Sequence, residues 1–288
     1  MLSHCVAKTI GVVTSSMKAA VLGRPISHSL SPVLHNAAYA ALGLPWNYSA
    51  IDCGEEELAD FIGGCDAEWA GFSLTMPLKR VALQVATAVD ERASQVGAAN
   101  TLLPIEGGWR ATNTDVDGVT GALVEHGVTV GEVGSAVVLG AGGTAQAAVV
   151  ALAELGLTEC TVLVRDPVRA QQLRVTAQRT GVDVTVAVLD PQAEALRSAV
   201  VISTLPAGAA DSLADHPWEQ GQTLLDVVYS PWPTAVAAAA LAGGATVVSG
   251  ALMLLHQAAV QVELMTGQLA PLEAMRDALR TAAPGAGL

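Results

Sequence analysis

The sequence predicts an α/β protein of two domains, and three observations support that prediction. The chain has 288 residues, which is about twice the usual length of one domain. Its composition is 51% hydrophobic and only 14% charged, which excludes a disordered chain and allows a sizeable core. Short apolar runs alternate with longer helical stretches along the chain. That alternation is typical of sheets covered by helices.

The first half of the chain repeats a pattern of strand, loop and helix up to about residue 119. We expect strands at 19–22, 46–51 and 71–74, and helices at 33–42 and 55–62. Ser31 is a good N-cap for the first helix, Pro32 suits its first turn, and Gly43 would end it. Pro77 would let another helix begin at Leu78.

The second half alternates more regularly, which predicts a parallel sheet. We expect strands at 136–139, 161–164, 184–188, 200–204, 223–228 and 245–248, a helix at 144–155, and two C-terminal helices at 251–265 and 272–281. A long uncharged segment between Asp226 and Glu263 contains prolines and paired glycines, and alanine dominates it. A membrane-spanning helix needs about 20 strongly apolar residues in a row. We therefore expect no membrane span.

Charge, cysteine spacing and the N-terminal segment argue against further classes of function. The formal net charge of -13 argues against a nucleic-acid partner, because phosphates repel an acidic surface. The four cysteines form no Cys-x-x-Cys pair, and His28 and His35 have no third ligand at a suitable spacing, so we expect no metal site. Scattered thiols suit a reducing, cytoplasmic location. Residues 1–17 lack a signal-peptide layout, and we interpret them as an N-terminal extension.

A glycine-rich turn follows the predicted strand at 136–139. Its residues Gly140-Ala141-Gly142-Gly143-Thr144 lead into a helix, which is the setting of the dinucleotide-binding fingerprint. Gly140 permits the tight turn, Gly142 lets the backbone approach a pyrophosphate, and Ala145 allows close packing of helix on strand. The helix N-terminus offers free N–H groups to the phosphates. These features predict a Rossmann-like parallel-sheet domain that binds a dinucleotide.

The end of the next predicted strand indicates which dinucleotide binds. An NAD site usually carries a carboxylate about 20 residues after the first glycine. Here Arg165 and Arg169 occupy that region, and they favour the 2′-phosphate of NADP through charge-assisted hydrogen bonds. Asp166 opposes this interpretation, because its carboxylate would repel a phosphate. We predict NADP as the cofactor; the alternative is that both arginines are solvated surface charges.

A single lysine follows the third predicted strand. The chain has only three lysines, Lys8, Lys18 and Lys79, although arginine is far commoner. A lysine can give up a proton and an arginine cannot at ordinary pH, so Lys79 suits a step in which charge develops on an oxygen. The alternative is a surface lysine that starts a helix. The hydroxyls of Ser29 and Ser31, before a predicted helix start, are suited to a carboxylate; capping by Ser31 alone is the alternative.

The order of eight motifs resembles the shikimate dehydrogenase family from residue 19 to about residue 267. The motifs are PISHSLSP (25–32), SLTMPLK (73–79), GAANT (97–101), NTDVDG (113–118), GAGGTAQA (140–147), STLPAG (203–208), DVVYSPWPT (226–234) and GALMLLHQA (250–258). The resemblance implies reversible, NADP-dependent reduction of 3-dehydroshikimate to shikimate, in the shikimate pathway of aromatic amino acid biosynthesis. It also implies a substrate domain of residues 18–116 plus the returning C-terminal residues 251–288, and an NADP-binding domain of residues 117–250.

The resemblance assigns roles to single residues as well. Lys79 and Asp115 would form the catalytic pair, and Ser29 and Ser31 would bind the substrate carboxylate. Tyr229 would lie where nicotinamide meets substrate. The residues expected to hold the ring hydroxyls are Thr75, Asn100, Asp115 and Gln257. The residues expected to contact the cofactor are Gly140, Ala141, Gly142, Gly143, Thr144, Arg165, Arg169, Thr204 and Gly250.

The sequence departs from the family pattern at two places, and three alternative functions stay open. Ser73 stands where the family often has asparagine, and Val164-Arg165-Asp166 replaces the usual Asn-Arg-Thr beside the adenosine phosphate. One alternative is an NAD-dependent quinate/shikimate dehydrogenase of the same family. The others are a different two-domain reductase and a regulatory protein that binds the cofactor without turnover. We expect a monomer or homodimer whose partner is the small-molecule substrate.

Overall fold

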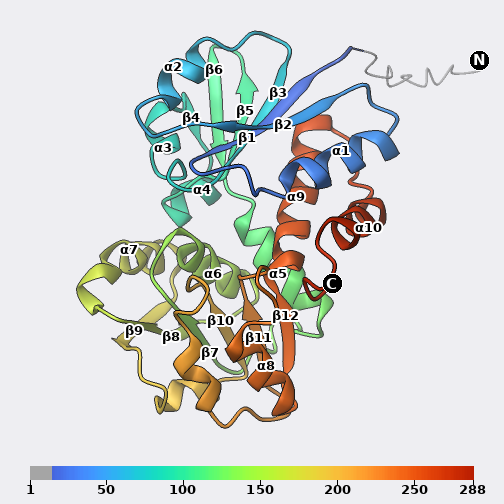
Figure 1. Ribbon diagram of the computed structural model, residues 1–288. Helices are drawn as coiled ribbons and strands as arrows, with labels where there is room; N and C mark the ends of the chain where they lie inside the picture. The colour runs from blue at the N-terminus through green and yellow to red at the C-terminus, as the bar shows by residue number, and fades with distance from the viewer. Residues whose placement is uncertain (1–14) are drawn as a thin grey trace, which may run out of the picture.

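The computed structural model describes residues 15–288, so residues 1–14 of the expected N-terminal extension lie outside the described residues. The described chain forms two six-stranded sheets, which lie one above the other in Figure 1. The first sheet uses residues up to Thr112, and the second uses residues from Ala136 to Ser249. Helix α5 (Asp115–Glu125) lies between the two units, and α9 (Gly250–Thr266) runs from this region along the first unit. The predicted α/β class is confirmed.

The first unit is a mixed sheet with the strand order β2-β1-β3-β5-β6-β4. Its elements are β1 (Lys18–Gly23), α1 (Ser31–Ala41), β2 (Asn47–Asp52), α2 (Leu58–Gly63), β3 (Trp69–Leu74), α3 (Ala82–Val85), β4 (Ala88–Val89), α4 (Glu91–Val96), β5 (Thr101–Ile105) and β6 (Gly108–Thr112). Strand β1 pairs in parallel with both β2 and β3, whereas β5 is antiparallel to β3 and to β6. The three predicted strands of this half are therefore present, and the sheet extends beyond them.

The hairpin of β5 and β6 was not expected from the sequence. Pro104 lies inside β5 opposite Trp109, and a proline inside a run argues against a strand because it has no N–H to donate. Gly107 makes the turn with a φ of 79°, a conformation that favours glycine. Since Thr101 pairs with Thr112, the hairpin brings the residues before β5 and after β6 to one place beside the end of β3.

Three predicted helix starts were wrong, and one of them is the start expected at Glu55, since α2 begins at Leu58. Leu30 is the N-cap of α1, and Ser31 is its first helical residue. The hydroxyl of Ser29 accepts a hydrogen bond from the Ser31 N–H at 3.3 Å, so the neighbouring serine satisfies that backbone group. The helix expected from Leu78 begins only at Ala82, because the chain first makes a turn over residues 76–81.

The second unit is a parallel sheet with the order β12-β11-β10-β7-β8-β9. Its elements are β7 (Ala136–Leu139), α6 (Gly143–Glu154), β8 (Glu159–Val164), α7 (Gln171–Thr180), β9 (Asp183–Val188), β10 (Val200–Ser203), β11 (Thr223–Asp226), α8 (Ala235–Ala242) and β12 (Thr246–Ser249). The strand order reverses between β7 and β10, and ligands of such sheets bind at the carboxyl ends of the strands at that point. Gly140 follows β7 there, and Thr204 follows β10. The predicted Rossmann-like sheet is confirmed, although β11 ends two residues before its expected end at 228.

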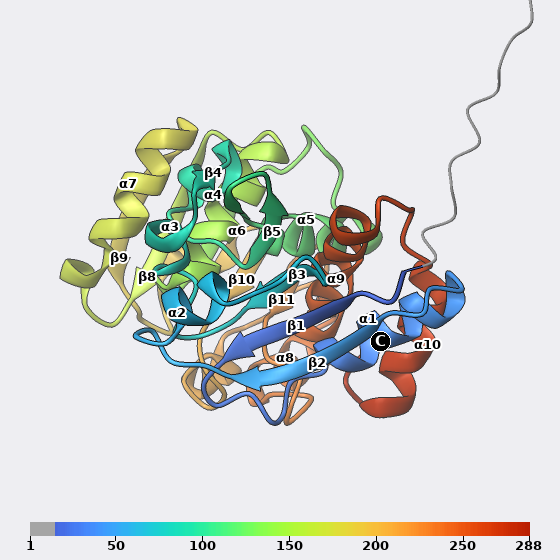
Figure 2. The ribbon, with the colours of Figure 1, turned by 90° about the horizontal axis from the view of Figure 1, so that it is seen from above.

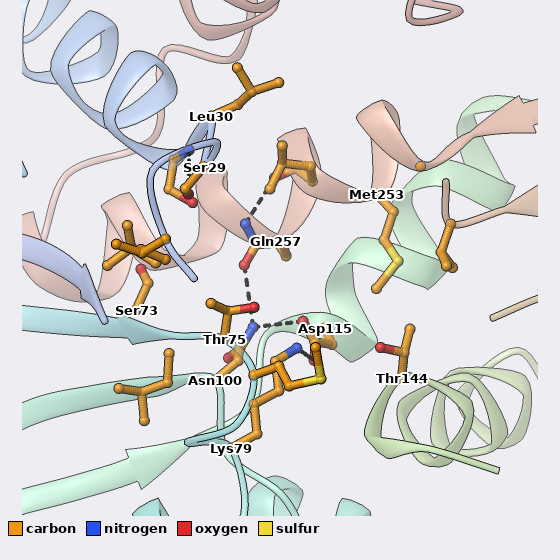
Figure 3. Close-up of a pocket in the computed structure, with 18 of the residues that line it drawn as sticks. Ser29, Leu30, Ser73, Thr75, Lys79, Asn100, Asp115, Thr144, Met253 and Gln257 are labelled. Carbon is orange, nitrogen blue, oxygen red and sulfur yellow. Dashed lines mark hydrogen bonds and ion pairs between the residues drawn. The ribbon is translucent and has the colours of Figure 1, made fainter. Parts of the chain in front are cut away.

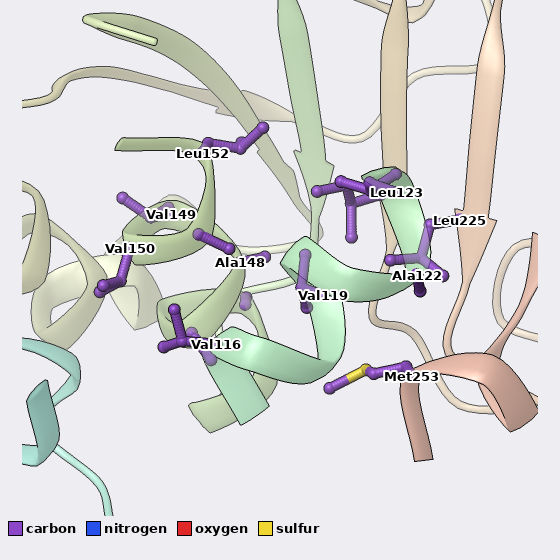
Figure 4. Packing of buried hydrophobic residues seen from close by; sticks show 14 of the residues in the cluster. Val116, Val119, Ala122, Leu123, Ala148, Val149, Val150, Leu152, Leu225 and Met253 are labelled. Atoms are coloured by element: carbon purple, nitrogen blue, oxygen red, sulfur yellow. The ribbon is translucent and has the colours of Figure 1, made fainter. Parts of the chain in front are cut away.

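The largest apolar cluster joins the two units through α5. Val116, Val119 and Leu123 of α5 are fully buried, and they pack with residues of α6 and with Met253 of α9 (Figure 4). Because this cluster also contains Leu34 of α1, it extends from the second sheet to a helix of the first unit. A single core therefore fixes how α5 lies between the sheets.

The C-terminal helices return to the first unit, as expected. Helix α10 (Leu272–Ala282) lies beside α1 at the edge of the first sheet in both views (Figures 1 and 2). Met265, near the end of α9, shares an apolar cluster with Tyr39 of α1 and Val21 of β1. No helix within residues 15–288 is long and apolar enough to cross a membrane.

Two glycines on α5 allow α9 to approach closely. A Cβ atom at Gly118 would lie 2.7 Å from the backbone oxygen of Met253, and one at Gly121 would lie 2.7 Å from the His256 ring. The backbone oxygen cannot rotate away as a side chain can. The approach of Gly118 to the Met253 backbone therefore sets the distance between α5 and α9.

We predict that Gly118→Ala lowers the free energy of unfolding by about 1–3 kcal/mol, because the added methyl overpacks the α5–α9 contact. Gly63→Ala is the matched control, since Gly63 is also helical and a Cβ there would meet nothing within 4 Å. The control should be neutral or more stable by up to about 1 kcal/mol. Urea unfolding of both variants tests this. Equal effects of the two substitutions would contradict the close approach.

Candidate active site

The loop between β1 and α1 presents two serine hydroxyls to a cavity of about 510 Å³ between the units. Ser29 and Ser31 both line this first cavity. The Ser29 N–H donates to the carbonyl of Ile26 at 3.0 Å, which closes the loop and fixes its serine. His35 holds the other end, because its Nδ1 lies 2.9 Å from the carbonyl oxygen of Ser31. Both predicted carboxylate-binding residues therefore lie on the same wall.

The lysine after β3 meets a carboxylate that lies 36 residues later in the chain. Lys79 Nζ lies 2.5 Å from Asp115 Oδ2. The side chain of Asp115 is 6% exposed and that of Lys79 is 23% exposed, so the carboxylate is buried and the ammonium reaches the cavity. Asp115 is the first residue of α5, where the helix dipole favours a negative charge. The Asp115 N–H donates to Asn113 Oδ1 at 2.9 Å, and this hydrogen bond fixes the N-terminus of α5.

Asn100 lies beside this pair and connects it to the C-terminal helix. Its Nδ2 atom lies 2.9 Å from Asp115 Oδ1 and 3.3 Å from Gln257 Oε1 of α9. Its Oδ1 atom accepts hydrogen bonds from the Thr114 N–H at 2.8 Å and the Thr101 hydroxyl at 2.9 Å. Figure 3 shows Asn100, Asp115 and Gln257 pointing into the same space as Thr75. An amide held from both ends cannot rotate freely.

Tyr229, Gly250 and Met253 form the wall on the side of the second sheet. Burial raises the pKa of the Tyr229 hydroxyl, so it stays protonated and can donate a hydrogen bond. Gly250 follows β12, and a Cβ atom there would lie 2.0 Å from the backbone oxygen of Val227. That position therefore requires glycine for packing. All predicted substrate residues line the first cavity.

A buried polar chain that reaches the wall of the first cavity was not predicted from the sequence. The Tyr48 hydroxyl donates to Ser73 Oγ at 2.5 Å, and Ser73 donates to Gln261 Oε1 at 2.8 Å. Gln261 Nε2 donates to Thr101 Oγ1 at 2.8 Å and to the Asn100 carbonyl at 3.2 Å. Gln261 is fully buried, four residues after Gln257 on the same face of α9. That spacing was the available signal. Ser73, one of the two departures from the family pattern, supports Asn100 through Gln261.

Two further cavities follow the glycine-rich turn. The second, of about 410 Å³, is lined by Gly142, Gly143, Thr144 and Thr204, together with Lys79. The third, of about 470 Å³, is lined by Gly140, Ala141, Gly142, Arg165 and Arg169. Every residue predicted to contact the cofactor therefore lines one of the three cavities.

The turn itself fits a dinucleotide. Gly140 has a φ of 107°, and a Cβ atom there would lie 2.6 Å from Thr204 Oγ1. A Cβ atom at Gly142 would meet no protein atom within 4 Å, so the space in front of this glycine is open to a ligand. Asp166 accepts a hydrogen bond from the Val168 N–H at 3.0 Å and caps the 3-10 helix Pro167–Ala170. The carboxylate that opposed NADP is thus bound to its own backbone.

No cluster of three or more His, Cys, Asp or Glu residues suited to a metal ion occurs among the described residues. His256 lies 2.8 Å from Glu125 of α5, and His35 stacks on Tyr48 with a centroid distance of 3.9 Å. Both rings therefore have partners within the fold.

Comparison with known proteins identifies the family. The model of the shikimate dehydrogenase substrate binding domain matches residues 21–102, and that of the shikimate 5′-dehydrogenase C-terminal domain matches residues 250–280. The shikimate dehydrogenase (NADP(+)) of Synechococcus sp. is 35% identical over 282 residues, which cover 92% of this chain and 94% of that relative. The chain belongs to the shikimate dehydrogenase family.

Solved structures of shikimate dehydrogenases share the whole fold. The Mycobacterium tuberculosis enzyme is 48% identical, with a TM-score of 0.83 over 92% of this chain and 99% of that chain. The Thermus thermophilus enzyme, in complex with NADP(H) and shikimate, is 34% identical, with a TM-score of 0.80 over 92% and 99%. The family predicted from the order of motifs is confirmed.

We predict that replacing Gln261 weakens the fold and the site together. Gln261→Leu removes the acceptor of the Ser73 hydroxyl and the donor to Thr101 Oγ1, which should lower the free energy of unfolding by about 1–3 kcal/mol. Gln178→Leu is the control, because Gln178 is exposed on α7 and should change stability by less than about 0.5 kcal/mol. Denaturant titration measures both. A Gln261 variant as stable as the control would show that this polar chain contributes nothing.

We also predict that His35 makes the fold sensitive to acid. Burial lowers the pKa of His35 to about 4 from its ordinary value of 6.5. Between these values the unfolded chain binds a proton that the folded chain does not, so stability is full above pH 6.5 and falls towards pH 4. The loss should be about 3 kcal/mol. Stability measured against pH should fall less steeply over this window for His35→Phe. Parallel profiles for the two proteins would rule out His35 as the source.

Proposed function

We propose that the chain catalyses the reversible, NADP-dependent reduction of 3-dehydroshikimate to shikimate, the activity that matches the names of its relatives. The observation that carries the proposal is that the first and second cavities adjoin at Lys79. Thr75, Met76, Lys79 and Thr144 line both of them. A substrate in the first cavity would therefore meet a cofactor in the second beside the Lys79 ammonium.

The charge and position of Lys79 suit the reduction of a ketone. NADPH, when bound, supplies the hydride that reduces the carbonyl carbon. Lys79 can stabilise the negative charge that grows on the carbonyl oxygen and can give that oxygen its proton. Asp115, 2.5 Å from the ammonium, holds it in place and balances its charge. In the opposite direction the neutral amine would accept the proton of the substrate hydroxyl.

The serine loop offers neutral donors to the substrate carboxylate. Arg24 also lines the first cavity, but its guanidinium lies 2.5 Å from Asp52 and 2.6 Å from Glu57. Its charge is therefore already paired. We propose that the hydroxyls of Ser29 and Ser31 hold the carboxylate instead, beside the N-terminal turn of α1.

The remaining polar groups suit the ring hydroxyls. Asn100 Nδ2 lies within 3.3 Å of three acceptors, on Thr114, Asp115 and Gln257, but an amide nitrogen has only two hydrogens. One of the three acceptors therefore lacks a hydrogen bond from Asn100, and a substrate hydroxyl between Asp115 and Gln257 would donate to the acceptor that is left. We propose that these residues, with Thr75 and Tyr229, orient the ring so that its ketone faces Lys79.

Cofactor selectivity rests on Arg165 and Arg169. Both line the third cavity, and their guanidinium groups suit a 2′-phosphate through charge-assisted hydrogen bonds. The relatives are named for NADP, in line with this pair of arginines.

The Lys79–Asp115 pair favours an enzyme over a regulatory protein, because a sensor needs affinity but no proton donor. We propose that residues 18–116 with 251–288 form the substrate domain and that residues 117–250 form the cofactor domain. A cytoplasmic location and a monomeric or homodimeric state stay predictions.

The proposal predicts that Lys79→Ala lowers kcat about 10²–10⁴-fold, the usual contribution of a general acid or base. The assay follows nicotinamide absorbance with shikimate, using NADP and NAD separately, and with quinate as a second substrate. Lys18→Ala is the matched control, because Lys18 is the other lysine of the described chain and pairs with Glu68 on the surface. The control should keep full activity.

Three results would each count against a part of this proposal. Absence of turnover by a folded protein that binds NADP would favour the regulatory alternative. An active Lys79→Ala variant would keep the enzyme and remove the assigned role of this lysine. A preference for NAD would keep the reaction and assign Arg165 and Arg169 to the surface.

A further inference from the structure

Arg80, the residue after Lys79, faces a different part of the cleft from its neighbour. Lys79 lines the first and second cavities, whereas Arg80 lines the second and third and does not line the first. Arg80 belongs to the unit of the first sheet, but the cavities that it lines follow the glycine-rich turn of the second. Its side chain therefore reaches the cofactor side from across the cleft.

The only hydrogen bond of the Arg80 side chain within residues 15–288 fixes it beside the start of α6. Arg80 Nη2 lies 3.4 Å from Oε1 of Gln146, which is in the first turn of that helix. Gln146 is 1% exposed, and its Nε2 donates to Thr176 Oγ1 at 3.2 Å. This buried amide is held by α7, so it can position the arginine.

The surroundings of Arg80 leave its charge available. Arg80, Arg165 and Arg169 form no ion pair with a carboxylate in the described part of the chain. Asp166 is the one carboxylate that lines the second and third cavities, and it caps a helix through the Val168 N–H. Three arginines thus gather around an open space on a chain of net charge -13. Such a local excess of positive charge suits an anionic ligand.

We propose that Arg80 binds the pyrophosphate of the cofactor from the side of the substrate-binding unit. This inference rests on the proposed use of a dinucleotide. Arg80 and Gly142 both line the second cavity and the third. The contact of Arg80 with Gln146 places its guanidinium at the first turn of α6, where the backbone N–H groups would face the phosphates. Arg165 and Arg169, in contrast, line only the third cavity, after β8.

The proposal gives different roles to Arg80 and Arg165: Arg80 sets the affinity for either cofactor, and Arg165 sets the selectivity for NADP over NAD. NAD and NADP have the same pyrophosphate, so Arg80 should strengthen the binding of both to the same extent. The 2′-phosphate occurs only in NADP, so Arg165 should strengthen NADP alone. An arginine after the catalytic lysine would also bring the cofactor and the substrate-binding unit together.

Titration calorimetry of the full chain with NADP and with NAD, without shikimate, tests this proposal, with NAD measured by competition if its binding is weak. Arg80→Ala should weaken both cofactors by the same factor, about 10-fold to 100-fold, which is the range for hydrogen bonds to charged groups. Arg165→Ala should weaken NADP alone. Arg110→Ala is the matched control for net charge, because Arg110 is exposed on β6 and lines none of the three cavities. It should bind both cofactors as the unchanged chain does.

Further measurements separate this inference from the proposed function. Arg80→Lys should recover only part of the affinity, because an ammonium cannot make the paired hydrogen bonds of a guanidinium. Binding of shikimate alone should not change in Arg80→Ala, since Arg80 does not line the first cavity. Unchanged affinity for both cofactors in Arg80→Ala would overturn the proposal, and a loss confined to NADP would overturn the assignment to the pyrophosphate. Either result can be read even if the chain shows no turnover of shikimate.

Discussion

The packing of α5 between α6 and α9 is the constraint on which the rest of the site depends. Gly118 lets the backbone of α9 approach, and Val116 and Val119 bury the same helix against α6. Asp115, the first residue of α5, therefore takes its position from the cores of both units. Because Lys79 lies on a loop of the first unit, its ion pair with Asp115 forms only when that packing is in place.

Burial of polar groups around this pair is stabilising only because most of the groups have partners. Asn100 is hydrogen-bonded through both ends of its amide, and Gln261 links it to Ser73 and Tyr48. An unpaired buried amide or hydroxyl would cost about 1–3 kcal/mol. The connected chain of hydrogen bonds thus gives the site fixed donors and acceptors, which a reaction with developing charge requires.

The charge around the cavities differs from the net charge of the chain. The chain is strongly acidic, yet the carboxylates that line the cavities are engaged: Asp115 by Lys79 and Asp166 by a backbone N–H. The arginines of the cofactor side have no such partners among the described residues, and Arg24 on the substrate side is paired twice. The hydroxyls of Ser29 and Ser31 therefore line the first cavity, whereas guanidinium groups without a carboxylate partner among the described residues line the third. The net charge of -13 alone would argue against a site for an anionic ligand.

The sequence by itself determined the features that local chemistry encodes. Strand alternation, the turn at Gly140 and the order of motifs predicted the class, the Rossmann-like sheet and the family, and Lys79 stood out by its rarity. The tertiary structure alone decided which side chains meet. Gln261 supports Asn100 across 161 residues, and Arg80 meets Gln146 across 66. The physical reason is that local patterns report backbone preference and burial, whereas a hydrogen bond between distant residues depends on how the helices and sheets pack.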